Sequence, residues 1–267
     1  MNWRRIRAIA EKDLDEVRKN RIAVVSSTIL AVVFSIILPV IMTQAMVLEG
    51  GTSSDNITSL IPPALQEEMG SLTSQQQPVV LFLGYLLAPL FLILPLILAS
   101  VIAAEAFVGE KERKTLEALL HTPATDAEMF TAKVVASAVP AVLYAWGNFV
   151  VYTVVVNVAS YPIMQRIWFP TPIWLPIMFW IVPAIALMGT AATVLISSKV
   201  STFMEAYQAS GGLVVVVLGL LVAQISGILF LSPLIAIVVG SFLFAADAFL
   251  IWFGIEVFSR ERLVTRM

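Results

Sequence analysis

The stretch from Gly109 to Glu128 reads GEKERKTLEALLHTPATDAE, and it is charged and helix-forming in a chain that is otherwise largely apolar. Of the 267 residues, 59% are hydrophobic and 13% are charged, and the mean hydropathy is +0.93. Soluble domains carry about 25% charged residues, so this composition indicates a membrane protein. The chain has no cysteine, which excludes disulfides, thiolate metal ligands and thiol nucleophiles. The net charge of −2 gives no indication of a nucleic acid partner.

Six apolar stretches are long enough to cross the hydrocarbon core of a bilayer, which takes about 20 helical residues. They are Ile22–Met46, Val79–Ala104, Val134–Ala159, Pro172–Ser197, Gly211–Leu231 and Pro233–Val257. The first is too long for a signal-peptide core and lacks a small-residue cleavage site, so we expect it to be retained as a span. Proline cannot continue a helix interior, so Ser232 and Pro233 favour a tight hairpin between two full spans, with a short re-entrant pair as the open alternative. The predicted fold class is therefore all-α, a polytopic membrane protein with six transmembrane helices.

The basic residues predict the orientation, because loops rich in Lys and Arg stay in the cytoplasm. Of the 16 Lys and Arg residues, Arg166 is the one on the opposite side of the predicted membrane from all the others. We therefore expect a multi-pass protein of the cell (plasma) membrane with both termini in the cytoplasm. Residues 48–78 then form an external loop, which carries acidic residues and no basic one.

Residues 1–21 are expected to form a cytoplasmic amphipathic helix, and residues 22–267 the six-span domain. One helical face of the first segment is apolar, with Trp3, Ile6, Ala10, Leu14 and Val17. A helix of this kind lies in the membrane interface, in contact with lipid. Packing against a protein partner is the alternative, and the direct run into the first span favours the membrane surface.

The cytoplasmic segment 105–133 is predicted to form a helix, an elbow and a second short helix. Oppositely charged pairs four residues apart, which support an exposed helix, are Glu110/Lys114 and Arg113/Glu117. Thr122-Pro123 ends this helix, because the residue before a proline is pushed out of the helical region. Thr125 and Glu128 have the spacing of a capping box, which starts the second helix. A solvated connector needs neither two capped helices nor the leucine edge at Leu116, Leu119 and Leu120, so we expect a partner to dock here.

From Glu110 to Lys133, the sequence EKERKTLEALLHTPATDAEMFTAK resembles the signature of the type 2 permeases of ATP-binding-cassette (ABC) transporters. The residues that match the signature are Glu110, Glu112, Thr115, Leu116, Glu117, Leu119, Leu120, Thr122, Pro123, Glu128 and Lys133. Two positions depart from it, because Lys114 and Ala132 stand where glycine is usual. A weaker second match lies in the next cytoplasmic loop, at Lys199, Glu205, Ala206 and Gln208.

The resemblance implies an exporter-like permease subunit that works as a homodimer or with a related permease chain. It also implies a coupling helix between the second and third spans, which docks on a separate cytoplasmic ATPase subunit. The expected docking residues are Glu110, Glu112, Thr115, Leu116, Glu117, Leu119, Thr122, Pro123, Glu128 and Lys133. The sequence has no Gly-x-x-x-x-Gly-Lys-Ser/Thr phosphate loop. We therefore expect no cofactor and no catalytic residue in this chain, with ATP and Mg bound by the partner ATPase.

Three polar residues, Asn148, Gln224 and Asp247, fall inside the third, fifth and sixth spans. An acid at mid-bilayer costs about 2.5–3.5 kcal/mol on insertion scales, so it should face protein or water. The three residues are candidates for a translocation path or a dimer seam, and a protonated Asp247 bonded to a neighbouring helix is the alternative. Small residues predict close helix packing, at Ala184, Ala186, Gly189, Ala191 and Ala192 in the fourth span and at Gly212 and Gly219 in the fifth. A single histidine, His121, predicts no metal site.

Other functions stay open at this point. An ABC-type membrane subunit can pass ATP-driven motion to an outer-side partner, here through residues 48–78, without moving a solute. A channel or secondary transporter predicts inverted repeats or several charge-lined broken helices, and neither is evident in the sequence. A membrane hydrolase is disfavoured, because the sequence lacks His-Glu-x-x-His and Gly-x-Ser-x-Gly and has one mid-membrane aspartate.

Overall fold

The computed structural model describes residues 7, 11, 21–48, 69–112, 126–197, 199–200, 202–225 and 232–257. Within these ranges every regular element is a helix. Six helices are long and apolar enough to cross a membrane: Val25–Leu48, Gln76–Gly109, Glu128–Met164, Trp174–Ser197, Phe203–Ile225 and Pro233–Gly254. We call them spans one to six. The predicted all-α fold with six spans is confirmed, and each of the last two helices is long and apolar enough to cross a membrane.

Several spans are composed of more than one helical segment. Span one comprises α2 (Arg21–Val32), the π-helix η1 (Val33–Ile37) and α3 (Leu38–Leu48). Span two comprises α6 (Gln76–Val79), the π-helix η3 (Val80–Leu86), α7 (Leu87–Phe91), α8 (Ile93–Ala104) and the π-helix η4 (Glu105–Gly109), and α9 (Glu110–Glu112) follows it. Span three is α11 (Asp126–Met164), and span four comprises α12 (Trp174–Pro176), the π-helix η5 (Ile177–Ile181) and α13 (Val182–Ser197). Span five comprises α14 (Phe203–Gly211) and α15 (Val214–Ile225), and span six is α16 (Pro233–Val257).

Two helices differ from the prediction in their bounds. The helix expected to precede span three is not separate, because α11 runs unbroken from Asp126 to Met164 over 39 residues. At 1.5 Å per residue it is about 58 Å long, which exceeds the hydrocarbon core of about 30 Å. The fifth span begins at Phe203 and not at Gly211, because the polar helix α14 precedes its apolar part.

The predicted interfacial helix of residues 1–21 lies outside the described residues, except for Arg7, Glu11 and Arg21. Arg7 and Glu11 are helical and form an exposed ion pair, with Arg7 Nε 2.8 Å from Glu11 Oε1. The external loop of residues 48–78 is described at Leu48 and from Met69 onward.

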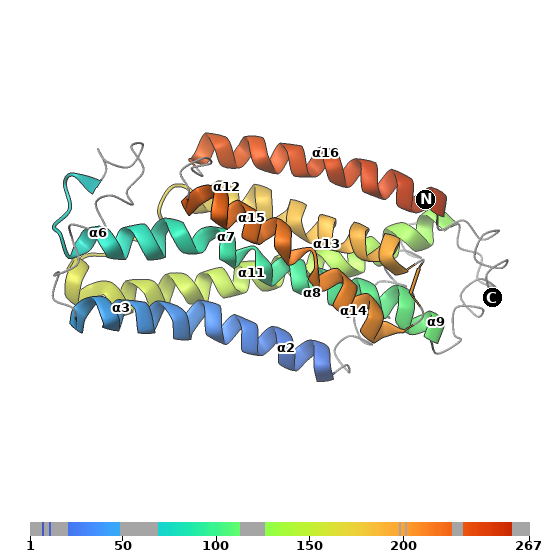
Figure 1. Ribbon diagram of the computed structural model, residues 1–267, viewed down its shortest axis with the longest axis horizontal. Coiled ribbons are helices and arrows are strands. Elements are labelled where there is room, and N and C mark those ends of the chain that lie inside the picture. The colour runs from blue at the N-terminus through green and yellow to red at the C-terminus, as the bar shows by residue number, and fades with distance from the viewer. Residues whose placement is uncertain are drawn as a thin grey trace.

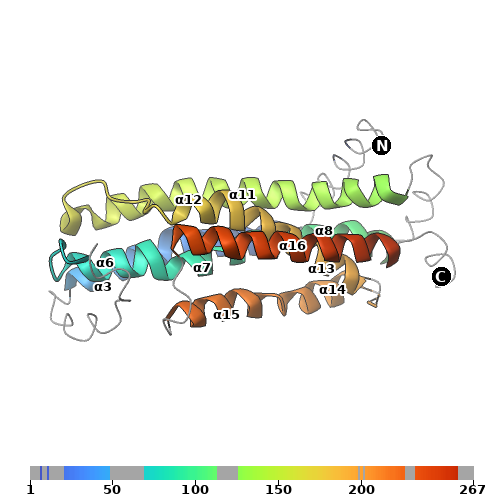
Figure 2. The ribbon, with the colours of Figure 1, turned by 90° about the horizontal axis from the view of Figure 1, so that it is seen from above.

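Spans two and four form the centre of the bundle. In an apolar 18-residue stretch of each span, the share of buried residues is 78% and 61% for these two spans, against 17–33% for the other four. In Figure 1 the spans lie roughly side by side along the long axis of the molecule, with α16 and α2–α3 at opposite edges. Figure 2 shows α14 and α15 as an outer row on one side of the bundle. The centre is therefore closely packed, and span five is attached at its side.

Gly189 sets the closest approach between the two central spans. A Cβ atom at this position would lie 2.9 Å from the backbone oxygen of Leu96 and 3.1 Å from Ser100 Oγ. The Ser100 hydroxyl donates to the Gly189 carbonyl over 3.4 Å. The predicted packing role of Gly189 is therefore confirmed. The close packing predicted at Gly219 is not found within the described chain, where an added Cβ would have no neighbour within 4 Å.

Three of the π-helices precede a proline: η1 precedes Pro39, η3 precedes Pro89 and η5 precedes Pro183. A π-helix bonds each N–H to the carbonyl five residues earlier, and proline has no N–H to donate. In span four the carbonyl five residues before Pro183 belongs to Met178. Trp146 Nε1 of span three donates to this oxygen over 2.8 Å. A side chain from another span thus bonds a carbonyl that proline leaves without a donor, as the bilayer interior requires.

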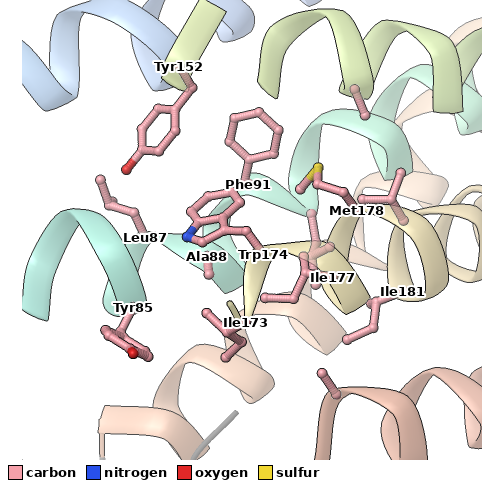
Figure 3. Close-up of a cluster of buried hydrophobic side chains, with 14 of the residues drawn as sticks. Tyr85, Leu87, Ala88, Phe91, Tyr152, Ile173, Trp174, Ile177, Met178 and Ile181 are labelled. Atoms are coloured by element: carbon pink, nitrogen blue, oxygen red, sulfur yellow. The ribbon is translucent and has the colours of Figure 1, made fainter. Parts of the chain in front are cut away.

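The largest apolar core lies between spans two, three and four, and Trp174 is at its centre. Figure 3 shows this side chain beside Phe91 and Tyr152, whose ring centroids lie 5.5 and 5.2 Å from the Trp174 ring. The indole N–H donates to the carbonyl of Gly84 over 2.8 Å, and the Tyr152 hydroxyl donates to the carbonyl of Leu83 over 2.7 Å. These bonds fix one end of span two against spans three and four.

We expect Gly189→Ala to lower the free energy of unfolding by about 1–3 kcal/mol, because the new methyl group overlaps a backbone oxygen in a packed core. Gly219→Ala is the matched control. It adds the same methyl group to a helix where nothing is in contact with it, and should be neutral or stabilising, because alanine is the better helix former. Thermal unfolding of both variants in detergent measures the difference. Equal melting temperatures would contradict the close approach at Gly189.

Candidate functional site

Both ends of the segment between spans two and three lie among the described residues, at the end of the bundle that carries α9 (Figure 1). Residues 113–125 do not, so the predicted elbow and the predicted coupling helix fall outside the described part. The predicted docking residues that lie there are Thr115, Leu116, Glu117, Leu119, Thr122 and Pro123. The four others, Glu110, Glu112, Glu128 and Lys133, are placed by the structure.

Glu110 and Lys133 form a buried ion pair that closes the base of this segment. Lys133 Nζ lies 2.7 Å from Glu110 Oε2, and the two side chains are 0% and 2% exposed. Glu110 begins α9, directly after span two, and Lys133 lies two turns into α11. The first and last residues of the matched signature are therefore in contact, although 23 positions separate them.

The surroundings of Lys133 explain why an ammonium group is stable here. Its Nζ also donates to the backbone oxygen of Ala106 in η4, and it lies 5.2 Å from the centroid of the Phe107 ring. A cation over an aromatic ring is stabilised by about 2 kcal/mol when water is excluded. Two further carboxylates, Glu105 and Glu128, are buried at the same end of the bundle. The Lys133 ammonium group thus bonds both a side chain and a backbone carbonyl at the end of span two.

Glu112 makes a different contact, with the first residue of span five. Its Oε2 accepts a hydrogen bond of 2.9 Å from the backbone N–H of Phe203, the first residue of α14. The same helix start carries a capping box. Thr202 Oγ1 accepts from the Glu205 N–H over 3.3 Å, and the Glu205 carboxylate accepts from the Thr202 N–H over 3.4 Å. The two signature segments, far apart in sequence, therefore meet at the N-terminus of α14.

The helix α14 packs on the ends of spans two and four. Ala206 is fully buried against Ala104 and Val108 of span two. The hydroxyls of Ser210 and Thr193 lie 2.9 Å apart and join α14 to span four. Of the residues in the second match, Glu205 caps the helix and Ala206 packs under it, whereas Lys199 and Gln208 are exposed.

This arrangement can hold three helix ends in place relative to one another and pass a displacement of one to the others. It joins the end of span two, the start of span three and the start of span five through charged side chains. Among the described residues there is no group of three or more His, Cys, Asp or Glu side chains that could hold a metal ion.

Gln224 replaces a donor that proline removes. Its Nε2 donates to the backbone oxygen of Tyr85 over 3.0 Å. In a regular helix this oxygen would accept from residue 89, which is Pro89 and has no N–H. Asn148 is partly buried between helices, with Nδ2 donating to the Tyr144 carbonyl over 2.8 Å. Both side chains therefore bond within the chain, and whether they also line a path stays a prediction.

Asp247 lies in the interior of the chain, 1% exposed, on the face of α16 that carries Gly240 and Gly254. Gly240 packs against Trp180 of span four, and Gly254 packs against Phe130 of span three. Within the described chain neither carboxylate oxygen of Asp247 has a hydrogen-bond partner. The predicted hydrogen bond to a neighbouring helix is therefore not found there.

Sequence reasoning missed two contacts of this site. Nothing in the pattern paired Glu112 with the N–H of Phe203, because the contact joins two helices far apart in sequence through one backbone atom. The partner of Gln224 had a detectable signal, since Pro89 marks the Tyr85 carbonyl four residues earlier.

A comparison with protein families finds that residues 7–235 match the profile described as ABC-2 family transporter protein. The match covers spans one to five and both signature segments, and it ends at the start of α16, before Asp247. A search of curated proteins finds no matching relative.

We expect Lys133→Met to lower the free energy of unfolding by about 3–5 kcal/mol, because it leaves the Glu110 carboxylate buried without its cation. The double variant Lys133→Met/Glu110→Leu should recover most of that loss, since an apolar pair of similar volume can replace a buried ion pair. The yield of monodisperse protein in detergent and its melting temperature measure both. A double variant no more stable than the single one would contradict the pairing.

Asp247→Asn should leave the free energy of unfolding unchanged or raise it, because it removes a buried charge with no partner in the described chain. Glu110→Gln is the matched control, and it should be destabilising because it weakens an existing ion pair. The same thermal assay compares the two. A loss of stability in Asp247→Asn similar to that in Glu110→Gln would show that the Asp247 carboxylate has a partner.

Proposed function

Since this chain belongs to the ABC-2 family of transporter proteins, we propose that it exports a substrate by coupling to ATP hydrolysis in a separate ATPase subunit. At the coarser level it is a multi-pass membrane protein and the membrane permease subunit of an ABC transporter. The family implies a partner with an ATP-binding cassette. What we propose beyond this is that transport is outward, that the named residues dock on the ATPase, and that two permease chains form a dimer.

The buried Glu110–Lys133 pair carries this proposal. It fixes both ends of the segment between spans two and three to the bundle. A force applied to residues 113–125 is therefore transmitted to spans two and three at their junction. An ATPase docked on this segment would move both spans together.

Of the proposed docking residues, three are buried, Glu112 is exposed, and six lie outside the described residues. Glu110, Glu128 and Lys133 are buried in this chain, so their proposed part is to hold the base of the segment. Thr115, Leu116, Glu117, Leu119, Thr122 and Pro123 are proposed to contact the ATPase directly, through the leucine edge and charges that the sequence predicts. The ATPase would bind ATP and Mg, since this sequence lacks a phosphate loop.

The remaining features follow from the family and from the charge pattern. We propose two permease chains for each transporter, alike or related, because the resemblance implies a dimer. The distribution of Lys and Arg supports cytoplasmic termini and a cytoplasmic location for the segment 105–133. A plasma-membrane location is proposed on the same ground.

We expect a cytoplasmic protein with a phosphate loop to copurify with this chain from its own membranes in mild detergent, in stoichiometric amount by mass spectrometry. Glu117→Lys should weaken that association by about tenfold or more, because it places like charges together at the docking surface. It should also reduce ATP-dependent transport in vesicles while the protein stays inserted.

The matched control is Glu68→Lys, the same charge reversal in the predicted external loop, which should leave the association unchanged. Full ATP-dependent transport by Glu117→Lys would contradict the docking role of that residue. A complex that contains the ATPase and captures an outer-side protein, with no solute movement in vesicles, would favour transmission of motion over export.

A further inference from the structure

We propose that Glu112 is the positioning residue through which a displacement of the segment between spans two and three reaches span five. This inference rests on the proposed coupling to an ATPase and names the route of that coupling inside the chain. The residues that carry it are Glu110 and Glu112 of α9 and Phe203 of α14.

The helix α9 is held on two opposite sides. Glu110 and Glu112 are two residues apart, and at 3.6 residues per turn their side chains point about 200° apart around the helix axis. Glu110 bonds Lys133 of span three, and Glu112 bonds the Phe203 N–H of α14. The helix α9 therefore lies between span three and the start of span five, with one carboxylate on each.

The bond from Glu112 is not needed to cap α14 locally. The first N–H groups of a helix have no partner within it. The capping box of Thr202 and Glu205 already bonds the N–H of Glu205 and that of Thr202. The Phe203 N–H is left over, and a carboxylate 91 positions earlier accepts from it. A negative charge at a helix N-terminus is also favoured by the helix dipole.

A displacement of α14 would continue into α15. The short connection at Gly212 and Leu213 is hydrogen-bonded throughout, with backbone bonds of 3.0–3.2 Å from residues 212, 213, 215 and 216 to the carbonyls three residues earlier. The two helices are therefore joined by a continuous run of turns, and a tilt of the first is passed to the second.

Span five is less buried than the two central spans, although Gln224 joins it to the Tyr85 carbonyl of span two. In an apolar 18-residue stretch of span five, 17% of the residues are buried, whereas the corresponding shares for spans two and four are 78% and 61%. Under α14 the contacts are mainly apolar packing, with Ala206 on Ala104 and Val108, Phe203 and Tyr207 against Val101 and Ile102, and one hydroxyl pair to span four. Packed helices slide over contacts of this kind in shear motions. Span five would therefore tilt relative to spans two and four.

The test uses labels at two glycines, because the chain has no cysteine of its own. Gly219 lies in span five and Gly147 in span three, and an added Cβ at either meets nothing within 4 Å in the described chain. Each is changed singly to cysteine, labelled with an environment-sensitive fluorophore, and the permease is assembled with its ATPase in nanodiscs. The signal is the change in fluorescence on adding ATP, Mg and vanadate.

In the parent chain both labels should respond. In Glu112→Ala the response at Gly219 should fall by about threefold or more, within the range found for residues that carry coupling. The response at Gly147 and the amount of bound ATPase should be unchanged. Glu112→Gln keeps an acceptor oxygen for the Phe203 N–H and should restore part of the Gly219 response.

The matched control is Glu205→Ala, which removes a carboxylate from the same helix start and leaves both partners of the Glu112–Phe203 bond in place. An equal loss at Gly219 in Glu205→Ala would assign the effect to a weakened α14 and overturn the inference. A full response in Glu112→Ala, or loss of the ATPase from that variant, would also overturn it. If neither label responds in the parent chain although the ATPase is bound, the proposed ATP coupling itself fails, and the inference with it.

Discussion

The ion pair between Lys133 and Glu110 is the interaction on which the arrangement of the bundle at the α9 end depends. Two charges removed from water are costly, so such a pair persists only where each charge has several partners. Lys133 has three described ones, the Glu110 carboxylate, the Ala106 carbonyl and the Phe107 ring. Together they join the end of span two to the start of span three, so the segment between these spans is fixed at both of its ends.

The bundle combines a rigid centre with a lightly attached side. Gly189 lets spans two and four approach so closely that a single methyl group would overlap a backbone oxygen. In span five, an added Cβ at Gly219 would meet nothing within 4 Å in the described part of the chain. A transporter needs both properties, because a force applied at the cytoplasmic end moves a helix only when another part of the structure resists it. The Glu112–Phe203 bond lies between these two parts.

The buried polar groups differ in how the fold satisfies them. Gln224 and Trp146 bond carbonyls that lie upstream of prolines, so they belong to the packing of broken helices in lipid. Within the described chain Asp247 has no such partner, although it lies on the face of span six whose Gly240 and Gly254 pack against spans four and three. Its position inside one chain separates it from the outer faces of the spans, which would meet lipid or a second copy.

Hydropathy and charge in the sequence were sufficient to predict six spans, their approximate places and the segment at which a partner is expected, because burial in lipid requires long apolar helices whatever the packing. The family signature was also readable, since it is a local run of residues from Glu110 to Lys133.

Which residues of that run face inward depended on tertiary structure. Glu110 and Glu112 have the same side chain two positions apart, yet one is buried against Lys133 and the other is exposed and bonds Phe203. The unbroken start of α11 and the early start of span five were decided in the same way. Contacts between segments about 20 to 90 residues apart stabilise these helices, and no local pattern encodes such contacts.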